Sequence, residues 1–185
     1  IRLFCLSGSY SKPIDYSERL LKEYIKNLRQ LESFYYELKL ADKDGLADSS
    51  WSDNLKGCRQ AFHSALDDDL DTAKALDVIY GFLREWNIKT AGGRYNKATA
   101  EMILPEFEKM LDILGIQIIK VTDEEKNKIN QMIEKRDAIR IHVSDTEKPY
   151  READRIRDEL TKKNIIILDK PHGTTWIKQE KIKAE

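Results

Sequence analysis

The chain has 185 residues, of which 41% are hydrophobic and 35% are charged, and its formal net charge is −1. This length predicts one domain, or one domain with a small appendage. No apolar run approaches the roughly 20 residues that cross a bilayer, and no signal peptide precedes the first helix, so we expect a cytoplasmic protein without a membrane partner. The near-zero net charge by itself neither indicates nor excludes an RNA partner.

The first two thirds of the chain predict a helical bundle. A short apolar segment at 1–6 precedes a polar loop at 7–17, and Asp15 and Glu18 have the capping-box spacing of a helix start. Asp71 or Thr72 should begin a later helix. Apolar residues then recur at steps of three or four, which is typical of helices that bury one face. These stripes run from Leu21 to Leu38, Trp51 to Leu66, Ala75 to Trp86, and Ile103 to Leu114, where Gly115 should close the helix.

The remaining third has a mixed pattern. Thr122 and Glu125 predict the start of a fifth helix, which continues to Ile139. A polar linker is expected at 142–149, followed by a short helix at 150–163. The β-branched run at 165–168 and the turn at 169–173 predict a β-hairpin that returns through 174–177. The predicted fold class is therefore mainly α, an antiparallel helical bundle followed by a small α+β tail with a β-hairpin.

The chain shows no arrangement typical of a catalyst or a metal site. Consecutive carboxylates at 67–69 lack the loop spacing that brings oxygen ligands onto one ion, so we interpret them as helix-end residues. Cys5 and Cys58 have no metal-ligand spacing, which favours thiols in a reducing compartment. The histidines are far apart in the sequence, at positions 63, 142 and 172. We therefore expect no catalytic residue, no metal and no cofactor in this chain.

The tail contains residue types that recognise RNA. Tyr150, Asp154 and Arg157 fall at steps of three and four on the expected helix and so share a face. Arg140 lies upstream, and Asp169 and Trp176 lie in the hairpin. Arginine donates through a fork, aspartate accepts from base amino groups, and aromatic rings stack on bases, so together they can read unpaired nucleotides. An ordinary ion-paired helix face with a core aromatic ring remains the alternative interpretation.

Three segments, in this order, are similar to those of one family. They are R-L-F-C-L-S-G-S-Y-S-K-P-I-D-Y-S at 2–17, L-D-D-D-L-D-T-A-K-A-L at 66–76, and A-D-R-I-R-D-E-L at 153–160 followed by N-I-I-I-L-D and G-T-T-W. They resemble the C-terminal, tRNA-binding portion of the cysteinyl-tRNA synthetase family, a class I aminoacyl-tRNA synthetase. The match at 140–154 is several residues longer than the family's R-x-x-K-D-[WF]-x-x-A-D pattern, and Ala73 replaces a proline.

The resemblance implies a division into three functional parts. Residues 1–17 would be a stem-contact segment that follows a catalytic domain. Residues 18–141 would form a helical anticodon-stem-binding domain of the kind that several class I synthetases share, and 142–185 a small anticodon-recognition domain. The implied partner is tRNA(Cys), through its anticodon stem and loop, with no DNA partner and a monomeric full-length enzyme. The implied tRNA-binding residues are Arg140, Tyr150, Asp154, Arg157, Asp169 and Trp176.

The resemblance also implies the chemistry of the complete enzyme. A cysteine–tRNA ligase activates cysteine with ATP and transfers it to tRNA(Cys) for translation. The family's H-x-G-H motif, zinc ligands and K-M-S-K-S loop are absent from these 185 residues. ATP with Mg, and a Zn ion, are thus expected in a catalytic domain outside this chain. Two alternatives stay open: part of a related ligase that joins cysteine to an amino sugar, and a freestanding helical adaptor that binds protein.

Overall fold

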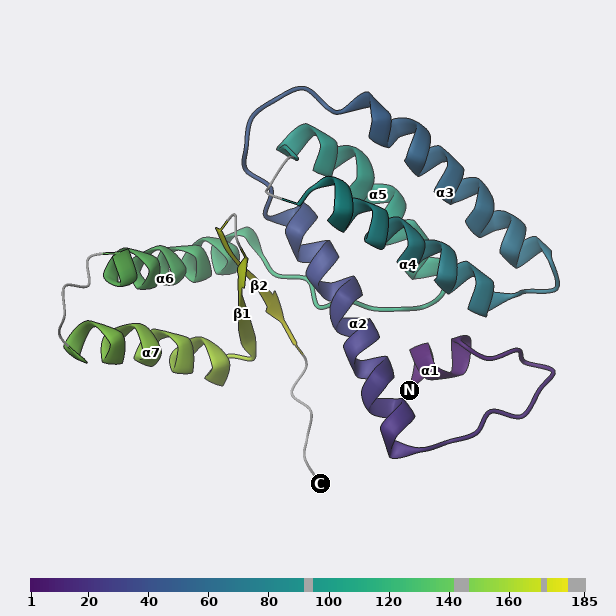
Figure 1. Ribbon diagram of the computed structural model, residues 1–185, viewed down its shortest axis with the longest axis horizontal. Coiled ribbons are helices and arrows are strands. Elements are labelled where there is room, and N and C mark those ends of the chain that lie inside the picture. Colours follow the sequence, from purple (N-terminus) through teal and green to yellow (C-terminus); the bar gives the residue numbers. More distant parts are fainter. Residues whose placement is uncertain (92–94, 142–146, 171–172, 180–185) are drawn as a thin grey trace. The chain divides into compact units, whose positions relative to one another are not determined.

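The computed structural model describes residues 1–91, 95–141, 147–170 and 173–179. Its contacts divide the chain into two compact units, Ile1–Ile118 and Ile119–Glu185, which are described separately below. Figure 1 shows that the first unit is wholly helical and that the second combines two helices with a hairpin. The predicted fold class, a helical bundle followed by a β-hairpin tail, is confirmed.

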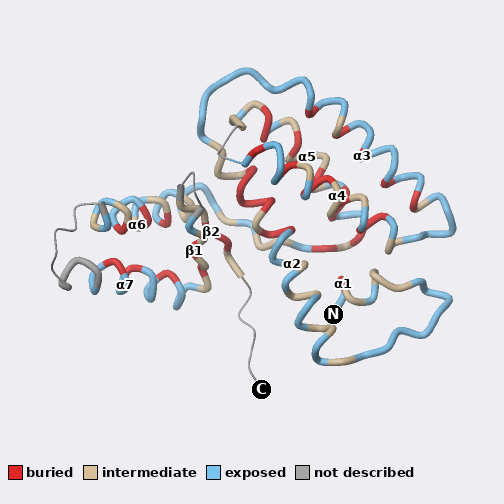
Figure 2. The backbone as a smooth tube through the Cα atoms, in the orientation of Figure 1, coloured by how far each residue is buried: buried red, intermediate tan, exposed pale blue. Residues whose placement is uncertain are grey.

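Over its described residues, the first unit contains five helices. They are α1 (Arg2–Leu6), α2 (Glu18–Lys39), α3 (Ser49–Asp67), α4 (Thr72–Lys89) and α5 (Lys97–Ile113). Helix α3 packs against both α4 and α5, and α2 packs against α5, while the short α1 contacts α2 and α4. In α3, α4 and α5 buried residues recur at steps of three or four, as the apolar stripes predicted, whereas the buried residues of α2 are concentrated in its second half, at 31–38 (Figure 2).

Aromatic rings fill the core of this unit. Phe34 of α2 makes edge-on contacts with Phe82 and Trp86 of α4 and with Phe107 of α5, at centroid distances of 4.8 to 6.1 Å. Trp51 of α3 packs against Trp86 at 4.8 Å. All five rings are buried, and edge-on contacts between such rings add stabilisation beyond their apolar area.

Helix ends follow the expected capping residues with one exception. Asp71 accepts from the backbone N–H of Lys74 at 2.9 Å, and Gly115 adopts the left-handed φ of 63° that closes α5. The cap of α2 is Ser17, whose hydroxyl accepts from the N–H of Leu20 at 3.2 Å. The prediction of Asp15 was therefore wrong, because α2 begins at Glu18 and Ser17, directly before it, occupies the cap position, two residues after Asp15.

The second unit contains α6 (Asp123–Ile141), α7 (Glu147–Lys162), β1 (Ile165–Lys170) and β2 (Gly173–Lys178). As predicted, Thr122 accepts from the N–H of Glu125, at 3.2 Å. Helix α7 begins at Glu147, so the expected linker was wrong for 147–149, whereas 142–146 lie outside the described residues. Pro149 falls in the first turn of this helix, where backbone N–H groups have no intrahelical acceptor.

The hairpin register determines which side chains face the helices. Strands β1 and β2 pair antiparallel, with Ile167 opposite Trp176 and Asp169 opposite Thr174. Side chains two residues apart on a strand, and cross-strand partners, share one face. Ile165, Ile167 and Asp169 therefore lie on the same face, and the two isoleucines are buried. Asp169 therefore follows two buried apolar side chains on this face, and it is the residue at which the face becomes polar.

Contacts place α6 in the same unit as α7 and the hairpin, with α6 packed on α7 and α7 on β1. The expected boundary at 141 falls between these two packed helices. The assignment of functions to residues 1–17, 18–141 and 142–185 stays a prediction, because it concerns contacts with tRNA. No helix in the described parts of the chain is both long and apolar enough to span a membrane.

Candidate nucleic-acid interface

Asp169 and Arg136 form the central ion pair of the second unit. Nη1 of Arg136 lies 3.0 Å from Oδ1 of Asp169, and Nη2 lies 2.9 Å from Oδ2. The guanidinium side chain is 4% exposed, whereas the carboxylate side chain is 38% exposed. A bidentate ion pair is stronger and more directional than a single contact, so Arg136 fixes the orientation of the carboxylate. The carboxylate nevertheless remains accessible to solvent.

Two further arginines approach the same carboxylate from different helices. Nη1 of Arg140, on α6, lies 3.3 Å from Oδ2, and Nη2 of Arg157, on α7, lies 3.5 Å from it. Both contacts are longer than those of Arg136, and both side chains are about half exposed, at 47% and 49%. Long, exposed ion pairs contribute little to stability, so these two guanidinium groups can exchange partners at small cost.

Thr174 completes the environment of Asp169. Its hydroxyl lies 3.1 Å from Oδ1, across the hairpin. The hydrogen bonds from Arg136 contribute most to lowering the pKa of the carboxyl to about 2, with smaller contributions from Thr174 and Arg140. The same interaction raises the pKa of the Arg136 guanidinium above its ordinary value. Asp169 is thus ionised, and only accepts hydrogen bonds, throughout the neutral range.

The structure brings together three of the six predicted site residues: Arg140, Arg157 and Asp169. Asp154 is exposed on α7, one turn before Arg157. Tyr150 lies in the first turn of α7, but its side chain is outside the described part of the structure.

Trp176 occupies a different environment from the one expected. Its side chain is 1% exposed, and its indole N–H donates to Oδ1 of Asn130 on α6 at 2.9 Å. A ring enclosed in this way cannot stack on a base, so the expectation of a direct stacking role is corrected. The cause is the hairpin register, which directs this side chain and Ile167 to the same buried face. Trp176 belongs to the core of the second unit.

Arg136 was not identified from the sequence. Its bidentate partner, Asp169, lies 33 residues further along the chain, and patterns among neighbouring residues do not reveal a pairing over that distance. The one available signal was the spacing of Arg136 and Arg140, which at i and i+4 lie on the same side of a helix. Both in fact contact Asp169, although only the second was expected at the site.

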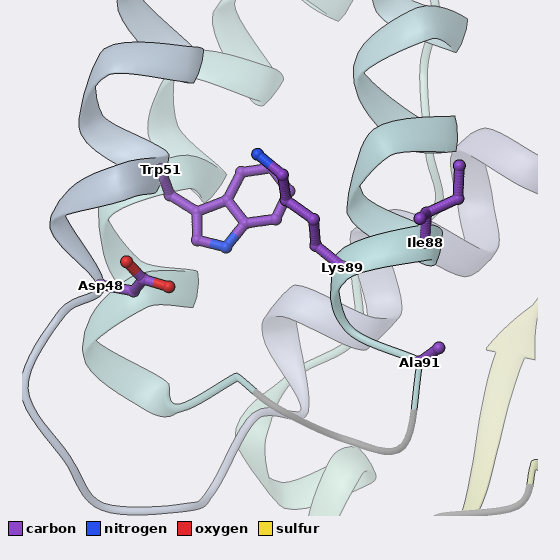
Figure 3. A pocket seen from close by; sticks show the side chains of 5 residues that line it. All are labelled: Asp48, Trp51, Ile88, Lys89 and Ala91. Carbon is purple, nitrogen blue, oxygen red and sulfur yellow. The ribbon is translucent and has the colours of Figure 1, made fainter.

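A hollow lies in the first unit, lined by Asp48, Trp51, Ile88, Lys89 and Ala91 (Figure 3). Its charged groups make contacts that stabilise the first unit itself. Asp48 caps α3 by accepting from the N–H of Ser50 at 2.9 Å, and Lys89 lies 5.2 Å from the Trp51 ring centroid while pairing with Glu85 at 2.6 Å. Since these groups are satisfied within the unit, the hollow presents no set of converging polar groups for a ligand.

The acidic residues 67–69 lie at the turn between α3 and α4. The carboxylate of Asp69 accepts from the hydroxyl of Tyr10 at 2.6 Å, and Asp68 pairs with Lys74 at 3.7 Å. Within the described residues, no three acidic, cysteine or histidine side chains are placed to hold a metal ion. His142 and His172 are outside those residues.

Part of the first unit matches a known domain family. Residues 61–118, which comprise the end of α3 together with α4 and α5, match the family model described as "DALR domain". The chain is also similar to proteins named cysteine–tRNA ligase along nearly its whole length. It is 36% identical over 182 residues to that of Geobacillus sp. (strain WCH70) and 32% identical over 180 residues to that of Finegoldia magna, each time with 95% of the chain covered.

The chain is therefore similar to part of the cysteine–tRNA ligases, and the resemblance seen in its three sequence segments is confirmed. A further relative, from Bacillus licheniformis, is 31% identical over 188 residues. The chain spans only 37% to 38% of the length of these three relatives.

Proposed function

We propose that this chain is the tRNA-binding part of a cysteine–tRNA ligase and that its second unit reads the anticodon of tRNA(Cys). The observation that carries the proposal is the convergence of Arg140 and Arg157 on Asp169, from two helices and a strand. The match to the DALR domain and the names of the relatives support the partner. Tyr150 and Asp154, on the same helix as Arg157, remain candidate contacts.

The charge of the centre suits an RNA loop. Three guanidinium groups surround one carboxylate, and Asp137 adds a second carboxylate that contacts Arg136 at 2.9 Å. Phosphate oxygens and base carbonyls can therefore draw Arg140 or Arg157 away from Asp169 and bind them instead. The carboxylate then becomes available to an amino group on the Watson–Crick edge of a splayed base.

We assign the other tasks of a ligase to other regions. The helices of the first unit would contact the anticodon stem. Cysteine activation would take place in a catalytic domain beyond these 185 residues, which would also hold ATP with Mg and the Zn ion. The chain itself would supply tRNA selection without catalysis, in an enzyme that acts as a monomer in the cytoplasm.

Titration of the chain with tRNA tests the proposal. We expect it to bind tRNA(Cys) with its GCA anticodon more tightly than single-base anticodon variants, and to lose affinity steeply between about 50 mM and 200 mM salt. Equal binding to all anticodon variants would overturn the reading function and favour a part of the amino-sugar ligase, which needs no anticodon reader. Absence of salt-dependent tRNA binding would overturn the RNA partner and favour a protein adaptor.

A further inference from the structure

We propose that Arg136 determines anticodon specificity as a positioning residue: it holds Asp169 so that one carboxylate oxygen, Oδ2, is the atom that reads a base. The inference rests on the proposed function and adds to it a residue and a reading atom. It follows from the unequal surroundings of the two carboxylate oxygens.

Oδ1 is already saturated with short hydrogen bonds. It accepts from Nη1 of Arg136 at 3.0 Å and from the hydroxyl of Thr174 at 3.1 Å. A carboxylate oxygen has two lone pairs, and these two donors use both. An entering base would have to break a contact with the buried guanidinium or with the neighbouring strand in order to reach this atom.

Among the described residues, Oδ2 has one short contact and two long ones. Nη2 of Arg136 lies at 2.9 Å, whereas Arg140 and Arg157 lie at 3.3 and 3.5 Å. The second lone pair is therefore held by exposed groups that can turn toward solvent or RNA. An amino group of a base can take their place at Oδ2 without disturbing the fork of Arg136.

Arg136 is suited to remain fixed during this exchange. Its side chain is 4% exposed, and its Nη1 also donates to Asp137 at 2.9 Å. Because it is enclosed by its own unit, it has little surface to offer to a phosphate. We infer that it acts on RNA only through Asp169, whereas Arg140 and Arg157 touch RNA directly.

The test substitutes Arg136→Lys, which keeps the positive charge but cannot form a fork. We expect the ratio of affinities for the GCA anticodon and its best-discriminated single-base variant to fall about tenfold, the value of one good base contact. The slope of affinity against salt should not change, since no phosphate contact is lost. Asp137→Asn is the matched control, because it removes the other carboxylate partner of the same arginine, and it should leave the ratio unchanged.

Thr174→Val provides a second variant that leaves the buried arginine in place. Loss of its hydroxyl frees one lone pair of Oδ1, so we expect the same ratio to fall, by about threefold, with the fold preserved by circular dichroism. An unchanged ratio in a folded Arg136→Lys protein would overturn the inference, as would a reduced salt slope. If Arg136→Lys does not fold, an unchanged ratio in Thr174→Val overturns it. Failure of the unsubstituted chain to discriminate anticodons would instead overturn the proposed function.

Discussion

The indole N–H of Trp176 donates to the amide oxygen of Asn130 at 2.9 Å and so joins the second hairpin strand to α6. The ring itself is almost completely enclosed. A residue with this environment acts on binding through the stability of the unit, and that can be measured separately from RNA contact.

We predict that Trp176→Phe lowers the stability of the second unit by about 2 kcal/mol, through lost volume and a lost hydrogen bond. Asn130→Ala, which keeps the ring but removes the acceptor, should cost about 1 kcal/mol. Hydrogen exchange of the amides in β1 and β2 measures both effects. A large loss of tRNA affinity in Trp176→Phe with unchanged amide protection would show that the ring contacts RNA after all.

The stability of the second unit should fall in acid because of Asp169. The pKa of this carboxyl is about 2 in the folded chain against an ordinary 3.8, so its contribution is complete only above about pH 5 and is lost as the pH falls through 3.8 toward 2. The side chain is 38% exposed, so screening limits the effect to about 1 kcal/mol. Among the described residues, the groups that contact it are the guanidinium groups of Arg136, Arg140 and Arg157 and the hydroxyl of Thr174.

Denaturation followed from about pH 5 to about pH 2 measures this dependence. Asp169→Asn is the control, since its amide does not ionise. The variant should be less stable at neutral pH, because Arg136 loses its charged partner, and should lack this component of the acid dependence. Identical pH profiles in the two proteins would contradict the prediction.

Replacing two glycines of the first unit by alanine should change the stability in opposite directions. Gly115 has a φ of 63°, and a Cβ there would meet the side chain of Arg2, which donates to the Gly115 carbonyl. Gly115→Ala should cost about 1 kcal/mol for the left-handed backbone. Gly81 lies inside α4 with nothing within 4 Å of its Cβ position, so Gly81→Ala should stabilise by about 0.5 to 1 kcal/mol. Thermal melting of both variants checks the contrast; a stabilising Gly115→Ala would refute it.

The exposed arginines should affect tRNA affinity directly. We expect Arg140→Gln and Arg157→Gln each to weaken tRNA binding about fivefold and to reduce the salt slope by about one. Arg155 is exposed on the same helix as Arg157 and has no contact with Asp169, so Arg155→Gln is the control and should leave the slope nearly unchanged. Equal effects of all three substitutions would indicate a diffuse positive surface instead of a defined centre.

Local sequence signals predicted most of the fold. Apolar spacing located the long helices, and Asp71, Gly115 and Thr122 act as expected because a cap involves residues only a few positions apart. The start of α7 was missed, since a proline in the first turn of a helix resembles a proline in a linker.

The candidate site was predictable only in part, because its geometry is non-local. Arg140, Arg157 and Asp169 were identified from residue type and family resemblance, and the structure brings them together. Arg136 was missed because its importance arises from burial against a strand 33 residues away. The environment of Trp176 depends on the strand register, which decides whether a ring faces the core or solvent.

The fork between Arg136 and Asp169 exists before any ligand arrives, so the carboxylate needs no reorientation when RNA docks. Folding has already ordered this carboxylate, so RNA binding requires little further loss of its conformational entropy. Its effect should therefore appear in how long a correct complex survives: matched and mismatched RNA should associate at similar rates and differ in their residence times.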